Sequence, residues 1–416
     1  MPGRTWVIAP DAESLRRRWR TLIDAPDGQK EVLFHPHLLN GKPGDKHSKR
    51  VVKKGLPGYE PRPTPVADER NLVVPPMRYG FRSFDRQWII PDNRVINRPN
   101  PKLWESHSEH QVYLTALAAH APSAGPAVTF TGLIPDLHHY KGSFGGRVYP
   151  LWHDRDASVA NISPNLLAYL SERYQQPVGA KDVMAYIAAV AAHPAFTARF
   201  KSDLVQPGLR VPLTADGEIF ATAAELGREV VWLHTFGERY ADPSRGRPAG
   251  TPRLAAGNAP LIPADGAIPS DPAAMPDTID YDATTRRLSV GNGYVENVEF
   301  RVWNYEISGK QVLRQWFSYR KANRERPMIG DRRTPSKLGE VQPDYWLAEY
   351  TTELINVLNV LGWLVELEQP QADLLERVCS AETISADELR KAGAFTEDVD
   401  TARRGPNSTE QYNLLG

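Results

Sequence analysis

The sequence predicts an α+β protein of several domains, with a β-rich N-terminal unit, a central helical unit, and a C-terminal β-hairpin followed by helices. Three observations carry this prediction. The 416 residues exceed the roughly 250–300 at which a single hydrophobic core stops growing. Hydrophobic residues make up 41% of the chain, which argues against a disordered protein. The spacing of apolar residues changes from alternation to a helical period after about residue 150.

The N-terminal unit, residues 1–150, begins with a short helix expected over 13–24 (ESLRRRWRTLID). The stretch 41–65 is rich in Lys, Gly and Pro, which predicts an exposed basic loop. Apolar and β-branched runs bounded by turn residues predict strands. These strands are expected within 30–38 (KEVLFHPHL), within 86–99 (RQWIIPDNRVINRP, two strands around a tight turn) and within 127–139 (AVTFTGLIPDLHH).

The central unit, residues 151–240, is expected to be helical. Ser163 is a candidate N-cap and Pro164 fits the first helical position, so a helix is expected to start there. A second helix, over 181–196, places apolar residues on one face at Val183, Ile187, Val190 and Ala191. His193-Pro194 is expected to end it, and a further long helix is expected over 217–236.

The C-terminal part opens with a stretch dense in Pro, Ala and Gly, which predicts a linker or insertion. After it, Gly291-Asn292-Gly293 separates two β-rich runs and predicts a hairpin. Helices are expected from about Lys310 and over about 345–368. The expected division of the chain is 1–150, 151–240, 241–277 (the linker) and 278–395, with a frayed tail over 396–416.

Composition and motifs argue against catalysis by this chain alone. The chain has 50 Lys and Arg residues and 50 Asp and Glu residues, so its net charge gives no indication of an anionic partner. The single cysteine, Cys379, excludes an internal disulfide framework and a thiolate zinc cluster. The sequence has no phosphate-binding loop, dinucleotide fingerprint, G-x-S-x-G elbow or H-E-x-x-H zinc motif. We therefore expect no catalytic residues, no metal and no cofactor.

Association with a membrane is not expected either. The N-terminus lacks the continuous apolar core of a signal peptide. The most apolar run, 354–367, is interrupted by Asn356 and Asn359 and falls short of the roughly 20 residues that a spanning helix needs. The sequence thus predicts a cytoplasmic protein.

Positive charge is concentrated in two windows. One lies in the basic loop, and the other runs from Arg301 to Lys337 with Trp316, Phe317 and Tyr319 interleaved. Basic residues among aromatics are typical of a surface that contacts phosphates, and a solvated charged face is the structural alternative. The DNA-binding candidates are Lys310, Arg314, Lys321, Arg324, Arg326, Arg332, Arg333 and Lys337, with Arg86 as a further candidate.

Three stretches carry a resemblance to a known family. They are FRSFDRQW at 81–88, AYIAAVAAHPAFTARFKSDL at 185–204, and VWNYEISGKQVLRQWFSYRK at 302–321. In this order they resemble the C-terminal coupler and target-recognition region of type ISP restriction–modification enzymes. The chain departs from the family pattern at Ser83 and around Phe196.

The resemblance implies a specificity module that reads double-stranded DNA in a restriction–modification system of phage defence. Whole enzymes of the family join a nuclease, a helicase-like ATPase, a DNA methyltransferase, a coupler and a target-recognition domain. The module would therefore direct a methyltransferase or helicase–nuclease supplied elsewhere. Two alternatives stay open: a fragment of, or a divergent, S-adenosylmethionine-dependent N6-adenine DNA methyltransferase, and a remnant that keeps the fold without reading DNA.

The stretch FRSFDRQW also raises a structural question, because it places charged residues among three aromatics. A buried charge costs several kcal/mol unless it is paired. We therefore expect Arg82 and Asp85 to form a buried ion pair that braces the domain. Arg86 would share the face of Phe84 and Trp88 on a regular strand, and direct contact of Arg86 with DNA is the less favoured of its two interpretations.

Overall fold

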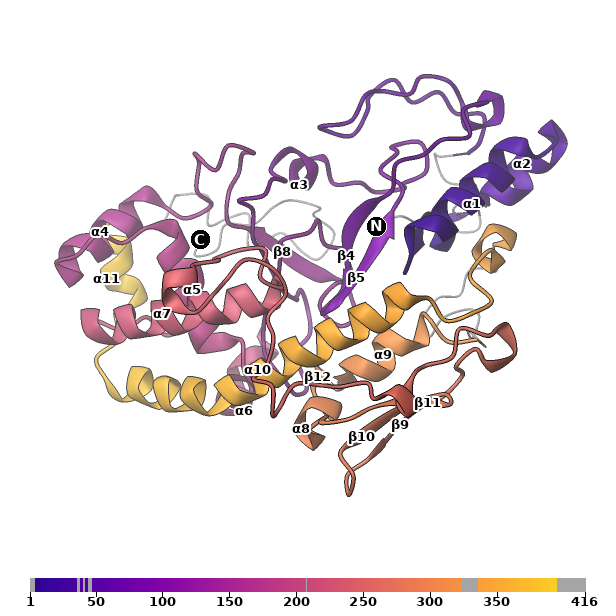
Figure 1. Cartoon of the computed structure of the whole chain (residues 1–416). Coiled ribbons are helices and arrows are strands. Elements are labelled where there is room, and N and C mark those ends of the chain that lie inside the picture. Colours follow the sequence, from indigo (N-terminus) through magenta and orange to yellow (C-terminus); the bar gives the residue numbers. More distant parts are fainter. Residues whose placement is uncertain are drawn as a thin grey trace.

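The computed structural model describes residues 4–35, 38–39, 42–43, 47–206, 208–322 and 336–394. It confirms an α+β fold of small sheets and packed helices (Figure 1). The longest helix, α10 (Ala348–Ser380), runs through the molecule and contacts helices of both the central and the C-terminal parts. Its 33 residues extend well beyond the expected 345–368, because Leu374, Leu375 and Val378 continue its buried side past Pro370.

The N-terminal part packs two helices beside a three-stranded antiparallel sheet of order β1-β5-β4. The elements are β1 (Ile8–Ala9), α1 (Ala12–Asp24), α2 (Asp27–Phe34), β4 (Met77–Arg82) and β5 (Asp85–Ile89), with a small β2 (Leu38–Leu39) and β3 (Lys42–Pro43) ladder. The expected first helix is confirmed. Asp11 caps it by accepting a hydrogen bond from the Ser14 N–H at 2.7 Å, and Trp19 is fully buried.

The strand expected over 30–38 was wrong, because most of that stretch belongs to α2. Lys30 and Phe34 lie four residues apart, and both side chains are fully buried. Lys30 donates hydrogen bonds to the Ala67 and Glu69 carbonyls, at 3.1 and 3.2 Å. A strand with period 2 would bury Val32 on the same face as Lys30 and Phe34, whereas Val32 is 67% exposed, as the helical period requires. Tertiary burial thus selects the helix.

Of the two strands expected over 86–99, only the first forms, as β5. The second half is a turn organised by Asp92, whose carboxylate accepts hydrogen bonds from the Arg94 backbone at 2.8 Å and guanidinium at 2.7 Å. Val95 and Ile96 then enter the core from this turn. Local side-chain bonding of Asp competes with strand pairing, which explains the difference.

A second antiparallel sheet, of order β7-β6-β8, lies between the N-terminal part and the central helices. Its strands are β6 (Tyr113–Leu117), β7 (Thr129–Thr131) and β8 (Gly146–Pro150), and α3 (Pro101–Glu105) precedes them. The strand expected within 127–139 is confirmed as β7. Residues 138–146 form the end of the loop between β7 and β8 and the first residue of β8.

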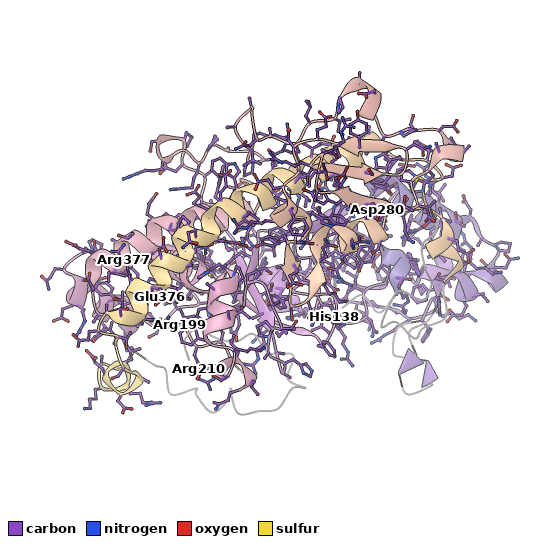
Figure 2. The ribbon with its side chains drawn as sticks, turned by 90° about the horizontal axis from the view of Figure 1, so that it is seen from below. His138, Arg199, Arg210, Asp280, Glu376 and Arg377 are labelled. Atoms are coloured by element: carbon purple, nitrogen blue, oxygen red, sulfur yellow. The ribbon has the colours of Figure 1, made fainter. Side chains whose placement is uncertain are left out.

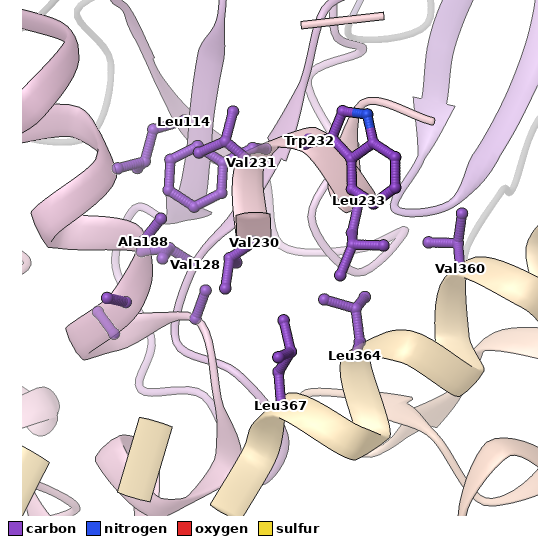
Figure 3. Packing of buried hydrophobic residues seen from close by; sticks show 14 of the residues in the cluster. Leu114, Val128, Ala188, Val230, Val231, Trp232, Leu233, Val360, Leu364 and Leu367 are labelled. Carbon is purple, nitrogen blue, oxygen red and sulfur yellow. The ribbon is translucent and has the colours of Figure 1, made fainter. Parts of the chain in front are cut away.

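The expected central helices are confirmed. They are α4 (Pro164–Tyr174), α5 (Ala180–Ala191) and α7 (Gly217–His234). The short helix α6 (Pro194–Arg199), which begins at the proline expected to end the second helix, was not predicted. Helices α5 and α7 cross so closely that a Cβ on Gly227 would lie 1.7 Å from the Ala185 carbonyl oxygen, so only glycine fits there. Figure 3 shows Leu233 of α7 facing Val360 and Leu364 of α10 in the main hydrophobic core.

The C-terminal part contains the expected hairpin. It is confirmed as the β10–β11 pair of a three-stranded sheet of order β11-β10-β9. Its elements are β9 (Ile279–Asp282), β10 (Arg287–Val290), β11 (Gly293–Val295), α8 (Phe300–Trp303), β12 (Glu306–Ile307), β13 (Lys310–Gln311), α9 (Val312–Ser318) and α11 (Ala386–Lys391). The helix expected from Lys310 starts at Val312 instead, because Lys310 and Gln311 pair with β12 around Ser308-Gly309. Both turn residues have positive φ, 49° and 78°, as a tight two-residue hairpin requires.

The described chain also contains short 3-10 helices: η1 (Thr5–Val7), η2 (Val66–Asp68), η3 (Asp203–Val205), η4 (Pro243–Arg245), η5 (Ala264–Gly266), η6 (Pro272–Ala274) and η7 (Lys337–Glu340). Three of them lie in the stretch 241–277. Hydrogen bonds hold this stretch against two helices, from Trp232 of α7 to the Pro248 carbonyl at 2.9 Å and from Trp363 of α10 to the Arg253 carbonyl at 3.1 Å. The division of the chain at 150, 240 and 277 stays a prediction.

Candidate nucleic-acid interface

The FRSFDRQW stretch forms the β4–β5 hairpin, and its buried charges are paired differently from the expectation. Arg82 pairs with Asp136 at 3.0 Å, and Asp85 pairs with Arg320 at 2.7 Å. The expected Arg82–Asp85 pair was therefore wrong, although both residues are buried and face each other in the ladder register. Each charge reaches across to another segment, so the hairpin is fixed on two sides.

Aromatic rings surround these two ion pairs. The Arg82 guanidinium stacks 3.7 Å from the Phe81 ring centroid, and Arg320 stacks 3.8 Å from that of Trp316. Phe84 occupies the turn with φ 62° and packs 4.9 Å from the His234 ring. The stretch is thus a structural brace, since its charges and rings are directed into the protein.

Arg86, the further DNA-binding candidate, is engaged in the same way. Its guanidinium pairs with Glu238 at 3.1 Å and with Glu353 at 3.2 Å, and it stacks 3.9 Å from the Phe236 ring. Glu353 also pairs with Arg78 at 3.1 Å. This network ties the β4–β5 hairpin to α10. Two carboxylates already neutralise Arg86, so its geometry does not favour contact with a phosphate.

The candidates of the basic-aromatic window are only partly described. Arg324, Arg326, Arg332 and Arg333 lie outside the described residues. Arg314 is exposed on α9, and its guanidinium lies 4.7 Å from the Trp303 ring. Lys321 follows α9, with its Nζ 3.8 Å from Asp277, and Lys337 is exposed at the start of η7. Trp316 and Phe317, which the sequence interleaves with these cations, are buried core residues.

Lys310 belongs to a different group of residues, which three loops bring together. We call the surface formed by the loops 118–126, 138–146 and 308–310 the three-loop surface. Lys141 donates a hydrogen bond to the Ser308 hydroxyl at 3.2 Å. Burial lowers the pKa of Lys310, and the nearby positive charges of Arg82 and Lys141 lower it further. Burial likewise lowers the pKa of Lys141.

No carboxylate neutralises this positive charge within the described chain. Neither Lys141 nor Lys310 forms an ion pair with a described residue, and the nearby Asp136 already binds Arg82. Across the β12–β13 ladder Glu306 pairs with Gln311, whereas Lys310 pairs with Ile307, so Glu306 and Lys310 lie on opposite faces. The three-loop surface is therefore suited to an anion supplied from outside.

One aromatic side chain projects beside Lys141. Phe144 is 62% exposed, although it has φ 65° in the 138–146 loop. Its ring lies 4.7 Å from the His120 ring and 5.2 Å from the Lys141 Nζ. The sequence prediction missed Lys141 and Phe144. The available signal was the aromatic set among glycines in KGSFGG at 141–146.

His138 holds this loop in shape. Its backbone carbonyl accepts a hydrogen bond from the Gly142 N–H at 2.7 Å, and its Nδ1 accepts one from the Gly145 N–H at 3.0 Å. Figure 2 shows His138 near the middle of the lower edge of the molecule, apart from Arg199 of α6 and Glu376 of α10, which form an ion pair on its left side. The three-loop surface is thus a local feature of one side.

Two histidines, His139 and His234, are buried in the core. Burial, and then the positive charge of Arg82, lowers the pKa of His139 to about 3. Burial, and then the charge of His139, lowers that of His234 to about 3. Among the residues that the structure describes, no three His, Cys, Asp or Glu side chains gather in a way that could hold a metal ion. Within those ranges no helix combines the length and apolarity that crossing a membrane requires.

Comparison with protein families decides the identity of this fold. The model of the type ISP C-terminal specificity domain matches residues 1–356. The chain belongs to this family. All three sequence stretches that carry the resemblance lie within the matched range, and no curated protein matches the chain.

Solved structures with a similar fold include two chains much longer than this one. The DrdV–DNA complex, determined by cryo-electron microscopy, aligns with a TM-score of 0.53 and 16% identity, over 91% of this chain and 35% of DrdV. The ATP-dependent type ISP restriction–modification enzyme LlaBIII, bound to DNA, aligns with a TM-score of 0.54 and 12% identity, over 91% of this chain and 22% of LlaBIII. The specificity-domain chain therefore spans about a third or less of these proteins. The similarity shows a shared fold, and it offers no support for the methyltransferase alternative.

Proposed function

We propose that this chain is the DNA target-recognition module of a type ISP-like restriction–modification system. The observation that carries the proposal is the specificity-domain match over residues 1–356. The module would bind double-stranded DNA and direct a methyltransferase or helicase–nuclease supplied elsewhere. It would act in the cytoplasm, in defence against phage. The DNA-bound states of DrdV and LlaBIII support this proposal by analogy of fold.

The charge distribution supports the same proposal. A protein with equal numbers of acidic and basic residues needs a local cationic surface to hold a phosphate backbone. The three-loop surface offers Lys141 and Lys310 without carboxylate partners among the described residues. Arg314, Lys321 and Lys337, with the four arginines at 324, 326, 332 and 333, remain proposed contacts. Phosphate contacts would position the module, and side chains not identified by charge alone would read base edges in the major groove.

A selection from a random duplex pool tests the proposal directly. Purified full-length chain is incubated with the pool at about 50 and about 200 mM salt, and the bound fraction is sequenced. We expect an enriched motif that survives the higher salt, because base contacts do not depend on counterion release. Binding without any motif would indicate a phosphate-only surface and contradict a recognition role. Absence of binding at both salt concentrations would contradict DNA binding altogether.

The methyltransferase alternative has its own measurement. Calorimetric titration with S-adenosylmethionine at millimolar concentration gives no heat of binding if the chain is a specificity module alone. Saturable binding would instead favour the divergent-enzyme hypothesis. This control belongs with the selection, since both use the same protein preparation.

A further inference from the structure

We propose that the three-loop surface grips one DNA strand, with Lys141 and Lys310 each contacting a phosphate and Phe144 packing against the sugar and base of an adjacent nucleotide. This inference rests on the proposed function, and it names a surface of the chain that would carry the contact. Lys310 is one of the sequence candidates, whereas Lys141 and Phe144 come from the structure alone.

The ammonium groups of Lys141 and Lys310 favour an anionic ligand at the three-loop surface. Ammonium groups that are half-buried and lack a carboxylate are held at a cost in solvation. Lys141 and Lys310 are such groups among the described residues, whereas the nearby Arg82 has Asp136 as its partner. The lowered pKa values record this cost. A phosphate between the two lysines would offset it, because each ammonium would gain a charge-assisted hydrogen bond.

The second argument is the exposed ring. A bulky side chain with φ 65° sits in a sparsely populated and strained backbone region. Hydrophobic burial does not explain this conformation, since Phe144 is 62% exposed. The strained backbone instead directs an aromatic ring outward beside Lys141, whose Nζ lies 5.2 Å from the ring centroid. Aromatic rings next to lysines are a common means of holding nucleotides, because every base offers an apolar face.

The third argument is that the frame of this surface is ordered. The Ser308 N–H donates to the Ala124 carbonyl at 2.8 Å, and the Ser123 N–H donates to the Ser308 hydroxyl at 3.1 Å. The Gln315 side chain donates to the Lys141 carbonyl at 3.3 Å. These bonds join segments nearly two hundred residues apart in sequence. A site whose loops are already held together loses less conformational entropy on binding.

The salt dependence of binding separates the two kinds of contact. Affinity of the full-length chain for a fluorescein-labelled duplex is measured by anisotropy from about 50 to about 200 mM salt. The duplex comes from the enriched pool, or from the starting pool if nothing is enriched. Variants are Lys141→Gln, Lys310→Gln, the double variant and Phe144→Ala. Controls are Lys391→Gln, an exposed lysine on α11, and Phe300→Ala, a phenylalanine that is 57% exposed on α8.

Each lysine variant is expected to reduce the magnitude of the slope of log affinity against log salt concentration by about 0.9, and the double variant by about 1.8. The reason is that binding releases fewer counterions when a phosphate contact is missing. Phe144→Ala is expected to weaken binding by roughly 5-fold or more at every salt concentration without changing the slope. Lys391→Gln and Phe300→Ala should match the wild type. The far-ultraviolet circular dichroism spectrum checks folding, and Lys310→Met replaces Lys310→Gln if the latter misfolds.

The possible failures are distinguishable. If the wild type binds DNA but the lysine variants keep its salt slope, or Phe144→Ala binds as Phe300→Ala does, the three-loop proposal is overturned and target recognition stands. If the wild type does not bind DNA, both proposals fall. If Lys391→Gln changes the slope as much as Lys310→Gln, the effect is one of total charge, and the assignment of phosphates to Lys141 and Lys310 is wrong.

Discussion

Replacing Asp85 with asparagine tests whether the FRSFDRQW hairpin braces the protein. Asp85 and Arg320 are 2% and 1% exposed at their side chains, and their charged atoms lie 2.7 Å apart. The Asp85 carboxylate also accepts a hydrogen bond from the Gln87 amide at 2.8 Å. Asn would turn one acceptor into a donor and leave the Arg320 charge buried without its carboxylate.

The expected loss follows from this geometry. Removing one partner of a buried ion pair costs about 3–5 kcal/mol, because the remaining charge is uncompensated. Arg320 would keep its hydrogen bond to the Trp316 carbonyl at 2.8 Å and its stacking on the Trp316 ring. We therefore expect a loss near the lower end, about 3 kcal/mol of unfolding free energy.

Urea denaturation measures this loss as a shift of the midpoint at unchanged slope. Arg16→Gln is the control, since Arg16 and Glu13 form a surface pair with 44% and 58% exposed side chains, and its loss should stay below about 1 kcal/mol. Adding Arg320→Met to Asp85→Asn should restore part of the stability, because no charge is then left unpaired. A loss under about 1 kcal/mol for Asp85→Asn, or no recovery in the double variant, would refute the bracing argument.

Two further predictions concern the core. Gly227→Ala should destabilise the protein by at least about 2 kcal/mol, because its Cβ would lie 1.7 Å from the Ala185 carbonyl oxygen. The control Gly28→Ala should leave the stability unchanged, since no atom lies within 4 Å of the added Cβ. Equal melting temperatures for the two variants would contradict the close crossing of α5 and α7. His139 and His234 have folded-state pKa values of about 3, below the unfolded value of about 6.5, so stability should be complete above pH 6.5 and fall as pH decreases toward 3. Each contributes up to about 1.4 kcal/mol per pH unit, and urea midpoints that do not change between about pH 7.5 and 5.5 would contradict this.

Much of the fold could be predicted from sequence because its signals are local. The helices at α1, α4, α5 and α7 carry apolar residues at helical spacing and start next to Asp, Ser or Gly at the N-cap. The Gly-Asn-Gly turn specifies the β10–β11 hairpin. Where the local signal was ambiguous, as at 30–38, burial of Lys30 and Phe34 decided the outcome.

The candidate site, too, could be predicted from the sequence only in part. By itself the sequence determined the α+β class, the family resemblance and which residues carry positive charge. Only the tertiary structure decided which charges are used internally: Arg86 is bound to Glu238 and Glu353, and Asp85 is bound to Arg320 across 235 positions. It also brought Lys141 to Ser308, near Lys310, and Phe144 next to Lys141. The physical reason is that pairing and solvation of a charge depend on neighbours brought in by long-range packing, whereas helix and turn preferences depend on residues a few positions away.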